Sequence, residues 1–440
     1  MKALLGLLLI AANVAAAPNV PPPAQRGAIM LTGATIHTVS GEVLVNGRML
    51  IENGKIAAVG RADAVPDRAG ATVIALNGKR IYPGLIAANT ALGLVEVQSV
   101  RATVDTAEIG ALNPNSRALI GVNADSELIP VARANGVLAA HTLPRANAGG
   151  LIAGTSALIQ LDGWTWDDMG LLPEVGLVVS LPSMRFNAAL YPTMPQARID
   201  EMQRLTMQRL KSLEEAFESA NAYAKARAAD ASLPLDSRWE AMVNVVNGKR
   251  PVFINAEELP QIRYALNFAE RFTLKIVIVG GQDAWRIAAL LRERDVPVVI
   301  AGTHRVPLRR GDDIDGPFTL AAKLHKAGVR FCIARNGSEF NAAMERSLPY
   351  EAATAAAHGL PRDEALKAVT LYPAQILGAA DRVGSLEVGK LASFIVTDGD
   401  PLEIRTNVER IFIQGREIAL TDRQTQLRDK YQQKYIQLQK

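Results

Sequence analysis

The sequence predicts an α/β protein in which a closed (β/α)₈ barrel is joined to a smaller β-domain built from both ends of the chain. Three observations support this prediction. Strand-like apolar runs alternate with helical stretches through the middle of the chain, and turn-rich β-segments lie near both ends. The 440 residues, 49% of them apolar, suffice for one large barrel and a lesser domain without disulfides.

The first residues, 1–17, have the pattern of a secretory signal peptide. Lys2 precedes the apolar run 3–12, which is followed by small residues up to Ala17. This run is too short to span a bilayer, which takes about 20 residues of helix. We expect a periplasmic or secreted protein with no membrane span, in which the Pro-rich residues 18–27 are a linker. A buried N-terminal helix is the alternative.

Residues 28–80 are expected to form the first part of the β-domain. Asn-Gly steps at 46–47, 53–54 and 77–78 separate short β-rich runs, and such steps mark tight hairpins. Residues 383–420 carry further short strand signals at the other end of the chain. Two such segments can complete one sheet, because each covers the other's edge.

Residues 81–382 are expected to form the barrel. Strand–helix alternation predicts parallel strands with helical crossovers, and the number of units favours a closed barrel over an open doubly wound sheet. The strand candidates are residues 81–88, 136–142, 175–181, 251–256, 274–281, 296–303 and 329–337.

Two further helices are expected outside the strand pattern. Residues 197–230 are rich in Arg, Glu, Gln and Ala, which indicates a solvated barrel helix or an insertion. Residues 421–440 form a C-terminal helix in which Leu427, Tyr431 and Tyr435 recur at helical spacing. We expect this helix to dock on the surface, with partner binding as the alternative.

The charge pattern argues against nucleic-acid binding. The net charge is +4, and the Lys and Arg residues are spread along the chain without a dense block. The one cysteine, Cys332, lies in an apolar run and indicates a small buried side chain. The sequence leaves open whether the chain forms a homo-oligomer.

Segments at both ends carry a family resemblance. NGRMLIENGKIAAVG and RIYPGLIAANTALG lie near the start, and TLYPAQILGAADRVGSLEVGKLASFIVTDGDPLE begins at residue 370. On these residues the chain resembles the amidohydrolase superfamily, and within it the imidazolonepropionase-like branch. The resemblance implies a metal-dependent hydrolase barrel flanked by a composite β-sandwich from both chain ends. It also implies hydrolysis of amide and other C–N bonds.

The family's metal, commonly zinc, is expected to lack its ligands here. The His-x-His pair of the first barrel strand is replaced by Asn89 and Ala91. Asn255, Glu257 and Gly280 stand where histidines of later strands are expected, and Asn336 replaces the strand 8 Asp. The neutral replacements are poor zinc ligands or none, so no cofactor is predicted.

Two functional hypotheses follow. In the first, the chain is a non-catalytic binding protein, and Asn89, Asn255 and Asn336 recognise a small uncharged polar or amide-type molecule through their amides. Trp164 and Trp166, in DGWTWDDM, could line a sugar or peptide groove, although such a cluster more often packs against a loop.

In the second hypothesis, the chain is a divergent C–N bond hydrolase that works without metal. Glu257 would act with His304 or His141, because both histidines follow strand candidates whose ends would line a barrel mouth. Each residue also has a structural alternative. The histidines could be hydrogen-bonded packing residues, and Glu257 could be stabilised at a helix N-terminus.

Overall fold

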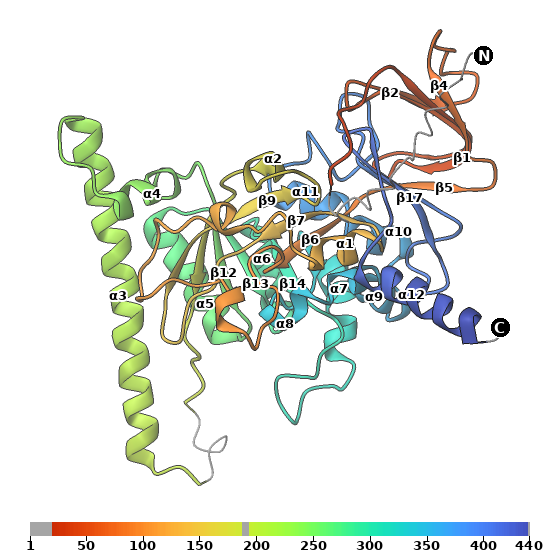
Figure 1. The fold of residues 1–440 in the computed structure, drawn as a ribbon. Coiled ribbons are helices and arrows are strands. Elements are labelled where there is room, and N and C mark those ends of the chain that lie inside the picture. The colour runs from red at the N-terminus through yellow and green to blue at the C-terminus, as the bar shows by residue number, and fades with distance from the viewer. Residues whose placement is uncertain (1–19, 187–192, 439–440) are drawn as a thin grey trace, which may run out of the picture.

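In a computed structural model, residues 20–186 and 193–438 are described and form a mixed α/β fold (Figure 1). The predicted signal peptide, residues 1–17, lies outside the described residues. Within them, no helix combines the length and the apolar character that crossing a bilayer requires.

Strands from both ends of the chain form one eight-stranded sheet, in the order β18-β17-β16-β5-β1-β2-β3, with β4 beside β1. The antiparallel pair β5–β16 joins the two ends and places Tyr82 opposite Ile395. In the β2–β3 hairpin, Asn53 and Gly54 adopt positive φ, as an Asn-Gly turn requires. The β-sandwich as such stays a prediction. The strands are β1 (Ile29–His37), β2 (Val43–Glu52), β3 (Lys55–Arg61), β4 (Thr72–Ala75), β5 (Arg80–Pro83), β16 (Phe394–Thr397), β17 (Val408–Ile413) and β18 (Arg416–Ile418).

The strands of the expected barrel form two sheets, and in the described part of the chain no hydrogen-bonded ring closes them. One sheet has the order β10-β9-β7-β6 and the other β15-β14-β13-β12-β11-β8. The strands are β6 (Leu85–Thr90), β7 (Val137–Thr142), β8 (Ile152–Thr155), β9 (Ala157–Gln160), β10 (Gly170–Leu172), β11 (Leu177–Ser180), β12 (Val252–Ala256), β13 (Ile276–Gly280), β14 (Val298–Ala301) and β15 (Phe331–Ala334).

Two features explain why eight equal parallel strands do not form. After β7 the chain makes short strands instead of a crossover helix, so β9 pairs antiparallel with β7 and β8 pairs antiparallel with β11. The second feature lies between the other edges of the two sheets. There β6 and β15 are neighbours, but a side-chain hydrogen bond links them in place of strand pairing. Asn89 Nδ2 donates to the Arg335 carbonyl at 3.0 Å. Strands β11 to β15 are parallel throughout, as expected.

Two helices project from the body in Figure 1, α3 and α12. Phe217 on one face of α3 is fully buried against Phe268 and Phe272 of α5, so this helix is more than a solvated face. The helices are α1 (Leu128–Arg133), α2 (Trp166–Met169), α3 (Gln196–Ala229), α4 (Ser237–Val246), α5 (Leu259–Phe272), α6 (Ala288–Glu293), α7 (Gly316–Lys326), α8 (Glu339–Ala342), α9 (Leu348–Ala357), α10 (Arg362–Lys367), α11 (Leu371–Ile376) and α12 (Arg423–Leu438).

Helix α12 does not dock as the sequence analysis expected. None of its residues is buried, and Tyr431 and Tyr435 remain 50% and 62% exposed. Its apolar side chains are separated by glutamine and basic residues. The stripe that contains Leu427 is therefore too narrow to bury a large apolar area.

Candidate functional site at the strand ends

Polar side chains gather at the carboxyl ends of β6, β12, β14 and β15, where a barrel would have its mouth. Each of these strands is apolar along its length and turns polar at its last residue or just beyond it. Since parallel strands end at the same edge, these side chains meet. We call this set the mouth cluster; its members are Asn89, Arg145, Glu257, His304, Arg305, Arg335, Asn336 and Glu351.

Glu257 is held by an arginine and a backbone amide. Its Oε1 accepts from Arg305 Nη1 at 2.7 Å, and its Oε2 accepts from the Gln282 N–H at 3.2 Å. The carboxylate lies directly over Gly280, where an added Cβ would come within 2.6 Å of Glu257 Cδ. Gly280 also has a φ of +104°. A histidine at position 280 would therefore collide with this carboxylate.

Glu351 is the second carboxylate of the cluster, and it is almost completely buried. Its Oε1 pairs with Arg335 Nη1 at 2.7 Å, and its Oε2 accepts from the backbone N–H groups of Thr303 and His304 at 2.7 and 2.9 Å. Arg335 Nη2 also donates to Asn341 Oδ1 at 2.8 Å. The guanidinium and the carboxylate thus neutralise each other inside the mouth.

His304 belongs to the Glu351 network and not to Glu257. The ring is 43% exposed, with Nδ1 3.6 Å from Glu351 Oε1 and Nε2 2.6 Å from Thr354 Oγ1. The Thr354 hydroxyl donates its one proton to the Tyr350 carbonyl at 3.0 Å. Glu257 and His304 bond to different partners, so the expected acid/base pair is not brought together.

His141 is a buried histidine with both ring nitrogens occupied. Nδ1 lies 3.0 Å from the Ala88 carbonyl, Nε2 lies 2.8 Å from Ser156 Oγ, and the ring packs against Phe253. Burial lowers the pKa of His141 to about 4, against a smaller raising effect of the Ala88 carbonyl. The imidazole is neutral near pH 7 and satisfies its neighbours, as a structural histidine does.

The three asparagines use their amides within the protein. Asn89 donates to the Arg335 carbonyl, Asn255 Nδ2 donates to Ser180 Oγ at 3.1 Å, and Asn336 Oδ1 accepts from the Ser338 N–H at 2.9 Å. Ala91, at the second histidine position, is buried in a small apolar cluster. Each of these amides thus makes at least one bond within the protein and holds part of the mouth in place.

Arg145, Glu345 and the Arg335–Glu351 pair are residues that sequence reasoning missed. The Arg145 Nε and Nη2 atoms are buried without a hydrogen-bond partner among the described residues. Burial raises the pKa of the Glu345 carboxyl to about 8, although the Thr90 hydroxyl and the Arg335 guanidinium both lower it. The one signal in the sequence was Arg335, a basic residue directly after an apolar strand.

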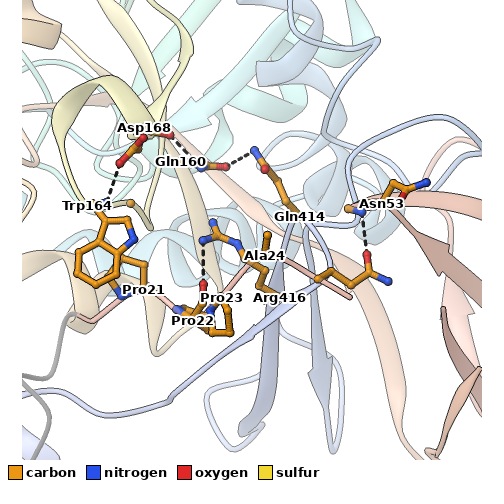
Figure 2. A pocket seen from close by; sticks show the side chains of 13 residues that line it. Pro21, Pro22, Pro23, Ala24, Asn53, Gln160, Trp164, Asp168, Gln414 and Arg416 are labelled. Atoms are coloured by element: carbon orange, nitrogen blue, oxygen red, sulfur yellow. Dashed lines mark hydrogen bonds between the residues drawn. The ribbon is translucent and has the colours of Figure 1, made fainter. Parts of the chain in front are cut away.

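The two tryptophans lie away from the mouth cluster. Trp164 is 65% exposed and lines a separate cavity, shown in Figure 2. Trp166 is 36% exposed and is not part of that lining. The sequence analysis placed both tryptophans in one groove, but only Trp164 lines this cavity.

Comparisons with known proteins point to one group of enzymes. The sequence profile described as "Amidohydrolase family" matches residues 312–421. The solved structure of an amidohydrolase from Thermotoga maritima MSB8 superposes with a TM-score of 0.76 at 25% identity, covering 89% of this chain and 99% of that one.

Two further matches are more distant. "Amidohydrolase tasK" of Hapsidospora irregularis is 22% identical in an alignment 427 positions long that covers 90% of this chain. The aligned part is 43% of that relative, so this chain spans less than half of its length. The structure of a molinate hydrolase shares the fold, with a TM-score of 0.53 at 17% identity over 90% of this chain and 95% of that one.

Proposed function

We propose that this chain, a member of the amidohydrolase superfamily of C–N bond hydrolases, is an exported protein in which binding has replaced metal-dependent hydrolysis. Its place in the imidazolonepropionase-like branch stays a prediction. The observation that carries the proposal is the pairing of both mouth carboxylates with arginines, Glu257 with Arg305 and Glu351 with Arg335.

The donor set of the mouth does not fit zinc. Zinc takes imidazole, thiolate or carboxylate donors at about 2.0–2.3 Å. Here the carboxylates already accept from guanidinium groups, and a side chain at position 280 would have to displace the Glu257 carboxylate. A divalent ion placed among Arg145, Arg305 and Arg335 would also be repelled by their charges. We derive no catalytic step through a metal.

A second candidate function rests on the arrangement of Thr354, His304 and Glu351. Hydroxyl, imidazole and carboxylate follow one another, which is the order of groups in a nucleophile–base–acid triad. A triad hydroxyl must donate to the imidazole, whereas the Thr354 hydroxyl donates to the Tyr350 carbonyl. The binding role is therefore favoured over a metal-free hydrolase.

A hydrolysis screen separates these functions. Mature protein is assayed on amino-acid p-nitroanilides and dipeptides with and without zinc, beside Glu257→Gln and His304→Ala. We expect no turnover that depends on either residue. Zinc-dependent turnover lost in Glu257→Gln would overturn the proposal. Zinc-independent turnover lost in His304→Ala would establish the second candidate in its place.

Export is proposed from the signal-peptide pattern of residues 1–17. N-terminal sequencing of the protein purified from its own cells should find a chain that begins near residue 18. A chain that retains the apolar run 3–12 would contradict export by cleavage.

A further inference from the structure

A cavity of about 650 Å³ opens between the sheet built from both chain ends and the loop that follows β9 (Figure 2). Its size is in the range of small-molecule sites, which are about 300–1,000 Å³. Its lining is predominantly uncharged. The residues that matter to the argument are Gln25, Gln160, Trp164, Asp168, Gln414 and Arg416.

Trp164 is exposed although the loop that carries it is firmly held. Asp162, at the start of the loop, pairs with Arg416 at 2.8 Å and with Arg133 at 3.6 Å. Asp168 Oδ2 accepts from the backbone N–H of Trp164 at 3.2 Å, and Thr165 Oγ1 accepts from the backbone N–H of Asp168 at 3.4 Å. The backbone that carries this exposed indole is therefore fixed, which lowers the entropic cost of stacking a ligand on it.

Side-chain amides cross the floor of the cavity. Gln414 Nε2 donates to Gln160 Oε1 at 2.7 Å, and Gln160 Nε2 donates to the Asp168 carbonyl at 3.1 Å. Figure 2 shows this row running from Asp168 to Gln414, with the Trp164 indole at one side. Amides offer both donors and acceptors without charge, which suits hydroxyl groups.

The N-terminal segment closes another wall. Gln25 anchors it, because Nε2 donates to the Ile51 carbonyl at 3.0 Å and Oε1 accepts from the Gly54 N–H at 2.7 Å. Arg416 Nη1 donates to the Pro22 carbonyl at 3.4 Å. Residues 21–25, which the sequence analysis placed in a linker, thus line a site.

The charges at the cavity argue against an anionic ligand. The Arg416 guanidinium pairs with the buried Asp162 carboxylate, which it shares with Arg133, so these three side chains carry a net charge of +1 that the nearby Asp168 carboxylate offsets. The Asp168 carboxylate is exposed and forms no ion pair among the described residues, so it repels anions. The groups left to contact a ligand are an aromatic face, several neutral amides and one carboxylate that can accept hydrogen bonds from hydroxyls.

We propose that this cavity binds a neutral saccharide of about disaccharide size, with Trp164 stacked against the C–H face of a sugar ring. The Asp168 carboxylate accepts hydrogen bonds from the sugar hydroxyls, and the amides of Gln160 and Gln414 both donate to and accept from them. A pyranose has one apolar face and a rim of hydroxyls, which matches an indole surrounded by amides. The site does not involve the mouth cluster, so its failure would leave the metal-free mouth intact.

The test uses isothermal titration of the mature protein with cellobiose, maltose and N,N′-diacetylchitobiose, which are all neutral. At least one should bind saturably, and Trp164→Ala should weaken that binding about tenfold, the size of a lost aromatic contact. Trp166→Ala is the matched control, because this residue lies two positions further on, at the start of α2, and outside the cavity. It should leave affinity unchanged.

A second variant, Gln25→Ala, tests whether residues 21–25 contribute to binding, and it leaves the Trp164 indole unchanged. It should weaken binding by loosening residues 21–25, while the circular dichroism spectrum stays that of the wild type. Three results would overturn the proposal: no saturable binding of any of the three sugars, equal losses in Trp164→Ala and Trp166→Ala, or saturable binding of choline in place of the sugars.

Discussion

The mouth cluster and the cavity of Figure 2 use polar side chains in opposite ways. At the mouth, Glu257 and Glu351 are each satisfied by an arginine and by backbone N–H groups. At the cavity, the Trp164 indole and the Asp168 carboxylate face water without a charged partner. An exposed aromatic face and an unpaired carboxylate are thus offered where the chain ends meet, away from the expected reaction centre.

The largest expected effect comes from breaking the buried pair at the mouth. Arg335→Leu would leave the buried Glu351 carboxylate without its cation, which should lower the free energy of unfolding by about 3–5 kcal/mol. Urea denaturation measures this. The control Arg330→Ala breaks an exposed pair with Asp295 and should cost at most about 1 kcal/mol. Equal losses in the two variants would mean that the mouth is solvated.

The pH dependence of stability tests whether water is excluded from the Glu345 carboxyl at the mouth. Its pKa is raised by burial from the ordinary 4.5 to about 8, so between these values the folded state binds more protons than the unfolded state. Stability should therefore fall as pH rises toward 8, by up to about 1.4 kcal/mol per pH unit. Unfolding free energies from pH 6.5 to 8 should show this slope in the wild type and a flatter curve in Glu345→Gln. Identical slopes would contradict a buried carboxyl.

Close packing at the mouth is tested by Gly337→Ala. A Cβ there would lie 2.6 Å from Asn89 Oδ1 and would collide with Arg145 Nη2. The control Gly378→Ala has a similar positive φ and open space around it, so it should show only the backbone cost of about 1–2 kcal/mol. We expect Gly337→Ala to lose about 1–3 kcal/mol more in denaturant unfolding. No difference would mean an open mouth.

The smallest effect is expected at α12. Tyr435→Ala should change the free energy of unfolding by less than about 0.5 kcal/mol, because its side chain packs against no core. Thermal unfolding at matched concentrations checks this. A loss of several kcal/mol would restore the docked helix that the sequence analysis expected.

The strands of the two inner sheets could be predicted from the sequence only in part. The parallel run β11 to β15 could be predicted, because each strand is a short apolar segment followed by a helix. The antiparallel strands β8 and β9 could not, since they replace a helix with short segments whose pairing depends on contacts far away in the chain. Gly154 illustrates this, because its φ of +133° and its approach to Ser116 follow only from the fold.

The candidate site was predicted only in part. That Asn89, Gly280 and Asn336 replace metal ligands stays a prediction, which could be made because it depends on strand position alone. Glu351 could not, since it lies in a helix and reaches the mouth only through tertiary packing. Nor could the wall made by Gln25, whose partners Ile51 and Gly54 belong to a distant hairpin.

Metal content tests the central claim most directly. The mature protein is dialysed against equimolar zinc and then against buffer, and bound metal is measured by plasma mass spectrometry beside Glu257→Gln. With the mouth carboxylates held by arginines, both proteins should retain far less than one metal ion per chain. One ion per chain in the wild type, lost in Glu257→Gln, would show that the mouth is a metal centre.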